Sequence, residues 1–210
     1  GSGIALMRAG QPDMPTLSAF LAQHLPEGGV LGFDGRTVST RLYRTLEEAL
    51  SAKHIQLDGA HDLAEEVWPD RPALSARPLW PLASDVSRRE KLSLLREKMA
   101  EKNAGHLLLT DLTDIAWTLN LRGGDVACTP VFLAFLLLSE ADAVLFVQPQ
   151  AVSPAIADAL AADGVTLRPY GDIYSHLSAL PAEDCVLLDS ATANSQITRA
   201  LAHARTVDAP

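Results

Sequence analysis

The chain has 210 residues, of which 48% are hydrophobic and 20% are charged, an ordinary composition for a folded soluble protein. Its 26 acidic residues outnumber 17 basic ones, and a formal charge of -9 excludes long-range attraction for nucleic acid or an anionic membrane. The longest apolar run, Val131 to Leu138, is much shorter than the roughly 20 residues that cross a bilayer. We therefore expect no nucleic acid and no membrane as partners, and the two distant cysteines indicate a reducing, cytoplasmic compartment.

Residues 1–68 are predicted to form a small α/β unit. Periodic apolar residues indicate helices over 17–25 and 37–52, and short apolar runs indicate strands over 30–33 and 55–57. These segments are too few for a full sheet. No internal repeat is apparent in the chain.

Residues 69–84 are predicted to be a proline-rich linker. The stretch WPDRPALSARPLWP, from Trp68 to Pro81, carries four prolines and therefore favours neither a helix nor a central strand.

Residues 85–210 show a longer and clearer alternation of helices and strands. Ser87 and Glu90 have the spacing of a capping box, and they start a helix that Gly105 ends. Further helices are predicted from a cap at Asp111 or Thr113 through Leu119, over 153–162 and over 172–180, and strands over 106–110, 131–138, 143–147, 165–169 and 185–188. This order predicts one α/β domain with a sheet flanked by helices.

The sequence NLRGGDVACTPVF, residues 120–132, lies between a predicted helix and a predicted buried strand. A phosphate-binding loop would place its glycines between a strand and a helix N-terminus, whereas Gly123 and Gly124 follow a helix. We interpret them as a structural turn that needs positive φ, with Pro130 leading into the strand.

Two aspartates, Asp114 and Asp125, have the ten-residue separation found in two-metal peptidases. The later ligands are missing, because the histidines that follow have no flanking glycine and the glutamates lie in polar turns; these residues are His176, His203, Glu140 and Glu183. We predict no metal ligand and no catalytic residue in this chain. Asp114 is interpreted as an acidic residue that a helix N-terminus favours.

Several other side chains have ordinary structural interpretations. Cys128 and Cys185 are predicted to be buried thiols, because both lie beside or within apolar segments. Trp117 is predicted to pack in the core, with the edge of a pocket as the alternative. Lys91 and its charged neighbours are predicted to form the solvated face of their helix.

The run from Asp114 to Phe132 resembles the signature D-x-I-A-W-L-x-N-x-R-G-x-D-[VI]-x-x-x-P-[VLI]-F in the second domain of three-domain Xaa-Pro aminopeptidases, the aminopeptidase P family. Other parts of the family are resembled by residues 6–12, 65–72, 164–170 and 188–194. The resemblance implies a creatinase N-terminal-domain-like, ribonuclease H-like mixed sheet flanked by helices, preceded by a smaller, incomplete α/β unit. The sequence departs from the family at Cys128 and Thr129, where an aromatic or histidine and an asparagine are frequent.

The resemblance also implies a function. The chain would be the non-catalytic N-terminal portion of a cytoplasmic Xaa-Pro aminopeptidase, a hydrolase and metallopeptidase that removes the residue preceding proline. Two divalent metal ions, usually manganese, would be held by a pita-bread catalytic domain that follows Pro210. The implied partners are that domain, a second subunit of a homodimer and a peptide with proline at its second position. We expect this chain alone to hold no cofactor and to be inactive, and we expect residues 4–68 to leave a sheet edge open.

Three residues are candidates for contact with substrate or for the wall of a cleft: Arg122, Asp125 and Trp117. The guanidinium of Arg122 can bind a carboxylate or carbonyl at two points, and Asp125 would orient it. An Arg122–Asp125 pair that only fixes the turn is an equally good interpretation. The alternative function is a binding or assembly module without peptidase activity, as in the peptidase-like region of the large subunit of the FACT histone chaperone. Metal ligands encoded beyond Pro210 would exclude that alternative.

Overall fold

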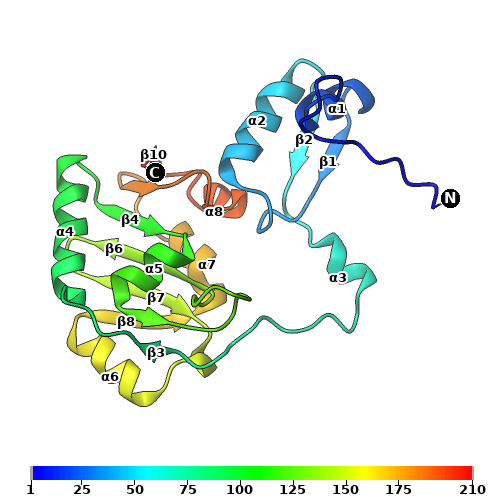
Figure 1. Cartoon of the computed structure of the whole chain (residues 1–210). Helices are drawn as coiled ribbons and strands as arrows, with labels where there is room; N and C mark the ends of the chain where they lie inside the picture. Colours follow the sequence, from blue (N-terminus) through cyan, green and yellow to red (C-terminus); the bar gives the residue numbers. More distant parts are fainter. Residues whose placement is uncertain (1, 210) are drawn as a thin grey trace.

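The computed structural model describes residues 2–209, so Gly1 and Pro210, at the outer limits of the two predicted units, lie outside the described residues. Figure 1 shows a small unit and a larger unit connected by an extended segment. Within the described residues, no helix is long and apolar enough to cross a membrane.

The small unit contains α1 (Leu17–His24), β1 (Val30–Gly32), α2 (Thr40–Ser51), β2 (Gln56–Asp58) and the short α3 (Leu63–Val67). The four predicted elements are confirmed, although α2 begins at residue 40 instead of 37 because the Ser39 side chain caps it. β1 and β2 run parallel and pair with no other described strand, which confirms the open edge. Its core is small, with Leu46, Leu50 and Ile55 as its buried centre.

The proline-rich segment forms no helix, as predicted. Residues 68–79 have no regular structure, and the following β3 (Trp80–Pro81) pairs antiparallel with β5 (Leu121–Arg122). The end of this segment is therefore attached to the large unit. The domain boundaries at residues 68 and 84 stay a prediction.

The large unit contains a six-stranded mixed sheet. Its strands, in spatial order, are β10 (Arg205–Asp208), β9 (Cys185–Leu188), β4 (His106–Leu109), β6 (Ala134–Ser139), β7 (Ala143–Val147) and β8 (Val165–Pro169). β6 runs antiparallel to both of its neighbours, and the other pairs are parallel. The predicted mixed sheet flanked by helices is thus confirmed.

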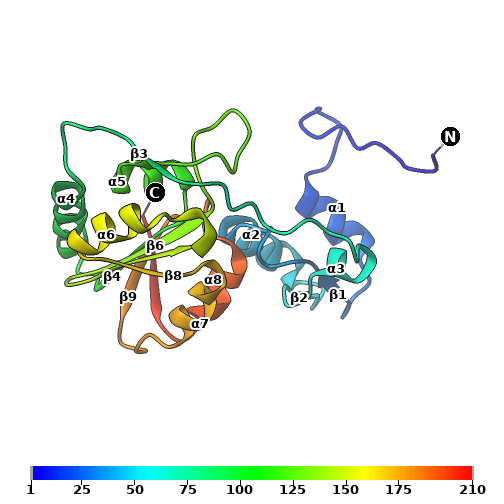
Figure 2. The same cartoon turned by 90° about the horizontal axis from the view of Figure 1, so that it is seen from below.

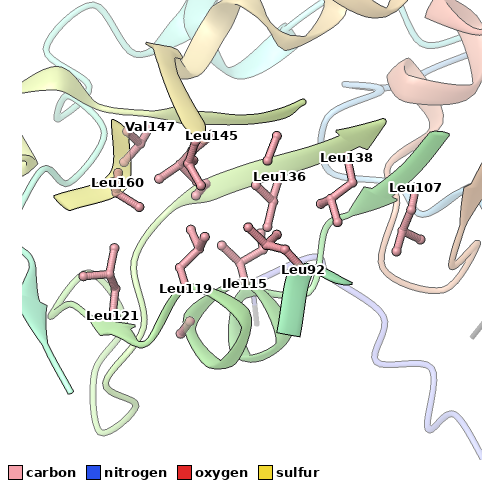
Figure 3. Packing of buried hydrophobic residues seen from close by; sticks show 14 of the residues in the cluster. Leu92, Leu107, Ile115, Leu119, Leu121, Leu136, Leu138, Leu145, Val147 and Leu160 are labelled. Carbon is pink, nitrogen blue, oxygen red and sulfur yellow. The ribbon is translucent and has the colours of Figure 1, made fainter. Parts of the chain in front are cut away.

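Both faces of this sheet are covered by helices (Figure 2). On one face lie α4 (Arg88–Glu101), α5 (Leu112–Leu119) and α6 (Pro154–Ala162), and on the other lie α7 (Ile173–Ser178) and α8 (Ser195–Ala200). Figure 3 shows how Leu92, Ile115 and Leu119 point from the first layer toward the strands. Two 3-10 turns complete the unit, η1 (Pro149–Ala151) and η2 (Tyr170–Asp172).

The differences from the predicted elements have local causes. The strand predicted over 131–138 begins only at Ala134, because the backbone of Val131 and Leu133 bonds to Asp125 instead of to a neighbouring strand. The helix predicted over 172–180 is shorter in the structure, because α7 spans only Ile173–Ser178 and the turn before it is the 3-10 helix η2. α8 and β10 follow the last predicted strand and were not predicted.

An internal repeat, not apparent in the sequence, lies where the two units meet. Residues 34–39 lie between β1 and α2, directly before the helix, and residues 189–194 link β9 to α8. The two turns, DGRTVS and DSATAN, share only their aspartate and threonine. In each turn the aspartate side chain accepts the N–H two residues later, from Arg36 at 2.9 Å and from Ala191 at 2.8 Å. The same turn therefore connects strand to helix in both units.

Candidate functional site

The signature segment begins at the end of α5. Asp111 caps the start of this helix by accepting the N–H groups of Thr113 and Asp114, and Asn120 ends it with a left-handed φ of 52°. Asn120 makes the reversal into β5. The predicted positive φ at Gly123 and Gly124 is wrong, since neither is among the positive-φ glycines of the described chain.

Three cationic side chains bind the carbonyl groups at the C-terminal end of α5. Arg88 Nε donates to Leu119 O at 2.9 Å, Lys91 Nζ to Trp117 O at 2.8 Å, and Arg122 Nη1 to Ala116 O at 3.0 Å. The last carbonyls of a helix lack partners within the helix and carry the negative end of its dipole. Cationic side chains at this end donate hydrogen bonds to the carbonyl groups and compensate the negative end of the dipole.

Lys91 is buried, so its prediction as part of a solvated face is wrong: only 3% of the residue is exposed. Its Nζ also donates to Asn120 Oδ1 at 2.6 Å and lies 4.3 Å from the centroid of the Trp117 ring. Burial and the nearby charge of Arg122 lower the pKa of Lys91. Lys91 thus ties the helix end, the left-handed Asn120 and the indole together.

Trp117 lies on the outer side of α5, and its predicted core position is wrong. The residue is 47% exposed, because Ile115 and Leu119 occupy the inward side of the helix. The indole covers the Lys91 ammonium, a cation–π arrangement. This leaves the alternative prediction, a position at the edge of a site.

Arg122 does not pair with Asp125, so the expected ion pair is wrong. Its Nη1 donates to Ala116 O and, at 2.8 Å, to Leu121 O, whereas Nε and Nη2 have no hydrogen bond to the described residues. Arg122 lies opposite Trp80 in the β3–β5 ladder, which places both side chains on one side of it. One edge of the guanidinium is thus fixed and the other is free.

Asp125 instead connects the linker to the loop. Its carboxylate accepts Ser75 Oγ at 2.5 Å, Arg77 N at 3.0 Å and Leu133 N at 3.0 Å. Burial alone would raise the pKa of Asp125, but these hydrogen bonds outweigh it and the pKa is lowered. The carboxylate is occupied by these structural contacts.

Gly123 is needed for close backbone approach. A Cβ at this position would lie 2.6 Å from Phe132 Cβ and 3.1 Å from a Leu79 methyl, whereas a Cβ at Gly124 would meet the flexible Arg77 side chain at 3.3 Å. The Gly123 N–H donates to Pro130 O at 3.4 Å, which ties the two ends of the loop together.

An open hollow lies between the linker and this loop, lined by Arg77, Trp80 and residues 123–130. Cys128 is exposed there in a left-handed conformation, so its predicted burial is wrong, while Cys185 is buried as predicted. Trp80 and Val126 are also exposed on this side. The hollow combines apolar side chains with the backbone of the loop.

The residues of this chain do not fit a metal pair. No group of three or more histidine, cysteine or acidic side chains within residues 2–209 could hold an ion. Asp114 lies in the first turn of α5, as predicted, and partial burial together with the charges of Asp111 and Asp189 raises its pKa. Asp114 and Asp125 thus have separate structural surroundings.

Known proteins are similar to this chain in both sequence and fold. Residues 70–210 match the family model of the creatinase/prolidase N-terminal domain. Aminopeptidase P2 of Arabidopsis thaliana is 34% identical over 201 residues, which cover 91% of this chain and 28% of that protein. Xaa-Pro aminopeptidase ApepP of Drosophila melanogaster is 36% identical over 151 residues, covering 70% of this chain and 25% of that protein.

A crystal structure shows the same arrangement over nearly the whole chain. It is the X-prolyl aminopeptidase of Caenorhabditis elegans, described as a cytosolic enzyme with a di-nuclear active site. The TM-score is 0.89 at 27% identity, and the match covers 98% of this chain and 35% of that one. The chain therefore spans about a third or less of these relatives.

Separate substitutions of Gly123 and Gly124 test whether close packing requires glycine at each position. Gly123→Ala should lower the free energy of unfolding by about 1–3 kcal/mol, because Phe132 and Leu79 are packed and must move. Gly124→Ala should cost less, because the Arg77 side chain can rotate away. Urea denaturation of both variants gives the comparison, and equal losses would contradict it.

Asp125→Asn tests the three hydrogen bonds through their pH dependence. The carboxylate has a lowered pKa in the folded state, so its contribution is present above the unfolded pKa of about 3.9 and disappears as pH falls through the folded pKa. We expect the variant to be less stable by about 1–3 kcal/mol at pH 7 and the difference to shrink below about pH 4. Asp158→Asn, on the exposed face of α6, is the control. A difference for Asp125→Asn that stays constant from pH 7 to pH 3 would disprove the assignment.

Proposed function

Because the chain belongs to the creatinase/prolidase N-terminal domain family, we propose that it is the non-catalytic N-terminal portion of an Xaa-Pro aminopeptidase. The whole protein would release the first residue of a peptide whose second residue is proline, using a metal-activated water. We place the two metal ions, with manganese as the first candidate, in the remainder of the protein, because residues 2–209 offer no ligand group. A cytoplasmic location and a homodimer belong to the same proposal.

The observation that carries a role in substrate access is the half-free guanidinium of Arg122. Its Nη1 is fixed on the end of α5, so the side chain is oriented before any ligand arrives. Nε and Nη2 together form an edge that can donate two parallel hydrogen bonds to a carboxylate or a carbonyl. We propose that this edge faces the entrance of the catalytic cleft and positions the peptide.

Exposed apolar side chains near the signature segment support the proposed contact with the catalytic domain. Four apolar side chains near the signature segment are 38–47% exposed: Trp80, Leu82, Trp117 and Val126. Trp80 and Leu82 are held there by the backbone of β5 and Asn120. Trp80 and Val126 line the same hollow beside the loop, and exposed aromatic and aliphatic side chains are typical of an interface. In this proposal the catalytic domain covers part of this surface and the remainder lines the substrate entrance.

Replacing Arg122 in the full-length enzyme tests this role against a purely structural one. Arg122→Ala should lower kcat/KM for an Xaa-Pro peptide by at least about tenfold, which corresponds to roughly 1.4 kcal/mol of lost transition-state binding. Arg88→Ala is the matched control. Arg88 also caps α5, but its remaining hydrogen bonds go to Ala159 O and Asp163.

Steady-state kinetics, thermal unfolding and metal content should be measured on both variants. We expect Arg88→Ala to lose stability and to keep its kcat/KM, and both variants to keep their metal. If the two variants lose kcat/KM equally, or if Arg122→Ala keeps the parent kinetics, Arg122 has only a structural role.

A further inference from the structure

The two units contact each other through the repeated strand–turn–helix element, and the contacts are reciprocal. Each turn accepts the first two N–H groups of the other unit's helix. The donors and acceptors are Thr40 N to Ala193 O at 2.8 Å, Arg41 N to Ser190 O at 2.8 Å, Ser195 N to Val38 O at 2.8 Å, and Gln196 N to Gly35 O at 3.1 Å. Equivalent residues of the two turns and their helices therefore occupy equivalent positions in the contact.

Side chains complete this contact. Ser39 and Asn194, the N-caps of α2 and α8, form an antiparallel bridge between the two turns. The hydroxyls of Thr40 and Thr198 lie 2.7 Å apart, and Ser195 Oγ donates to Gly35 O at 3.0 Å. Thr40 and Ser195 are both buried. Separation of the units would leave the first N–H groups of both helices without their partners.

The segment that joins the units is anchored at both ends and free between them. Arg71 contacts Asp62 of the small unit at 2.5 Å, and Ser75 contacts Asp125 of the large unit. Residues 72–74 between these anchors are exposed and form no hydrogen bond with any described residue. The path of the connection is thus set by only three residues.

We propose that this contact is an exchangeable interface: it closes within one chain while residues 72–74 can span the two units, and two copies of the chain swap their small units across it when the connection cannot close. Every hydrogen bond of the contact is kept in the exchanged dimer, because only the path of residues 72–74 changes. Within one chain the connection keeps the two surfaces at a high effective concentration, which favours the monomer. A connection too short to close within one chain shifts the balance to the dimer. This inference does not depend on the proposed function.

Shortening the connection tests the proposal on the full chain. Deletion of residues 72–74 removes up to about 10 Å of reach. The matched control replaces the same residues with Gly-Ser-Gly and keeps their number. Both chains carry Cys128→Ser, together with Thr40→Cys and Thr198→Cys, so that a disulfide reports which chains supply the two sides of the contact.

Light scattering and non-reducing electrophoresis give the result. We expect the deletion chain to have twice the monomer mass with disulfides between chains, and the control to be a monomer with a disulfide inside the chain. A deletion chain that stays monomeric with an internal disulfide, or that associates without the interchain disulfide, would overturn the proposal.

A proline at the first position of α2 shows whether this contact makes the dimer. Thr40→Pro, introduced into the deletion chain without the cysteine pair, removes the bond to Ala193 O at a helix position that accepts proline. Leu17→Pro occupies the same position in the exposed start of α1 and is the control. We expect Thr40→Pro to abolish the dimer and Leu17→Pro to keep it. A dimer that survives Thr40→Pro uses another surface and contradicts the proposal.

Discussion

The C-terminal end of α5 is the constraint on which the signature segment depends. A helix end that is covered by other elements needs partners for its last carbonyls. Here Arg88, Lys91 and Arg122 supply them from α4 and β5. Burying an ammonium is costly, and the bonds of Lys91 to a carbonyl and to the Asn120 amide, with the indole above it, offset that cost. The three cationic side chains therefore have a structural role at the helix end, and only the Nε–Nη2 edge of Arg122 remains for a ligand.

The position of the linker follows from this helix end. Asn120 turns the chain into β5, and β5 binds β3 as a two-residue ladder. Asp125 then fixes Ser75 and Arg77 a few residues upstream of β3 and fixes Leu133 just before β6. The segment that connects the units is consequently one wall of the hollow beside the loop. A change at the end of α5 would reach both the loop and the linker.

Local signals in the sequence predict much of the fold. The capping box of Ser87 and Glu90 starts α4 as expected, and Pro154 occupies the first turn of α6. The predicted strand over 143–147 agrees with β7 at both ends. The family signature, which depends on residue identity at fixed spacing, identifies the large unit. These features depend on residues close together in the chain.

What the sequence does not predict depends on residues far apart. Lys91 and Trp117 exchange their expected environments, because the packing of α4 and α5 decides which side of each helix is covered. The need for glycine at Gly123 arises from Phe132, across the loop. The repeat of residues 34–39 and 189–194 is visible only in its hydrogen bonds, since two shared residues carry too little signal. A charged residue such as Lys91 can be solvated or buried, and the sequence around it does not distinguish the two cases.

Amide hydrogen exchange in Lys91→Met tests the central role of the helix end most directly. Methionine keeps the apolar stem and removes the charge that binds Trp117 O and Asn120 Oδ1. We predict that the N–H groups of Arg77 and Leu133, which donate to Asp125, lose protection, while the N–H of Ile197 in α8 keeps it. Unchanged protection at Arg77 and Leu133 would show that the loop and the linker are held independently of the end of α5.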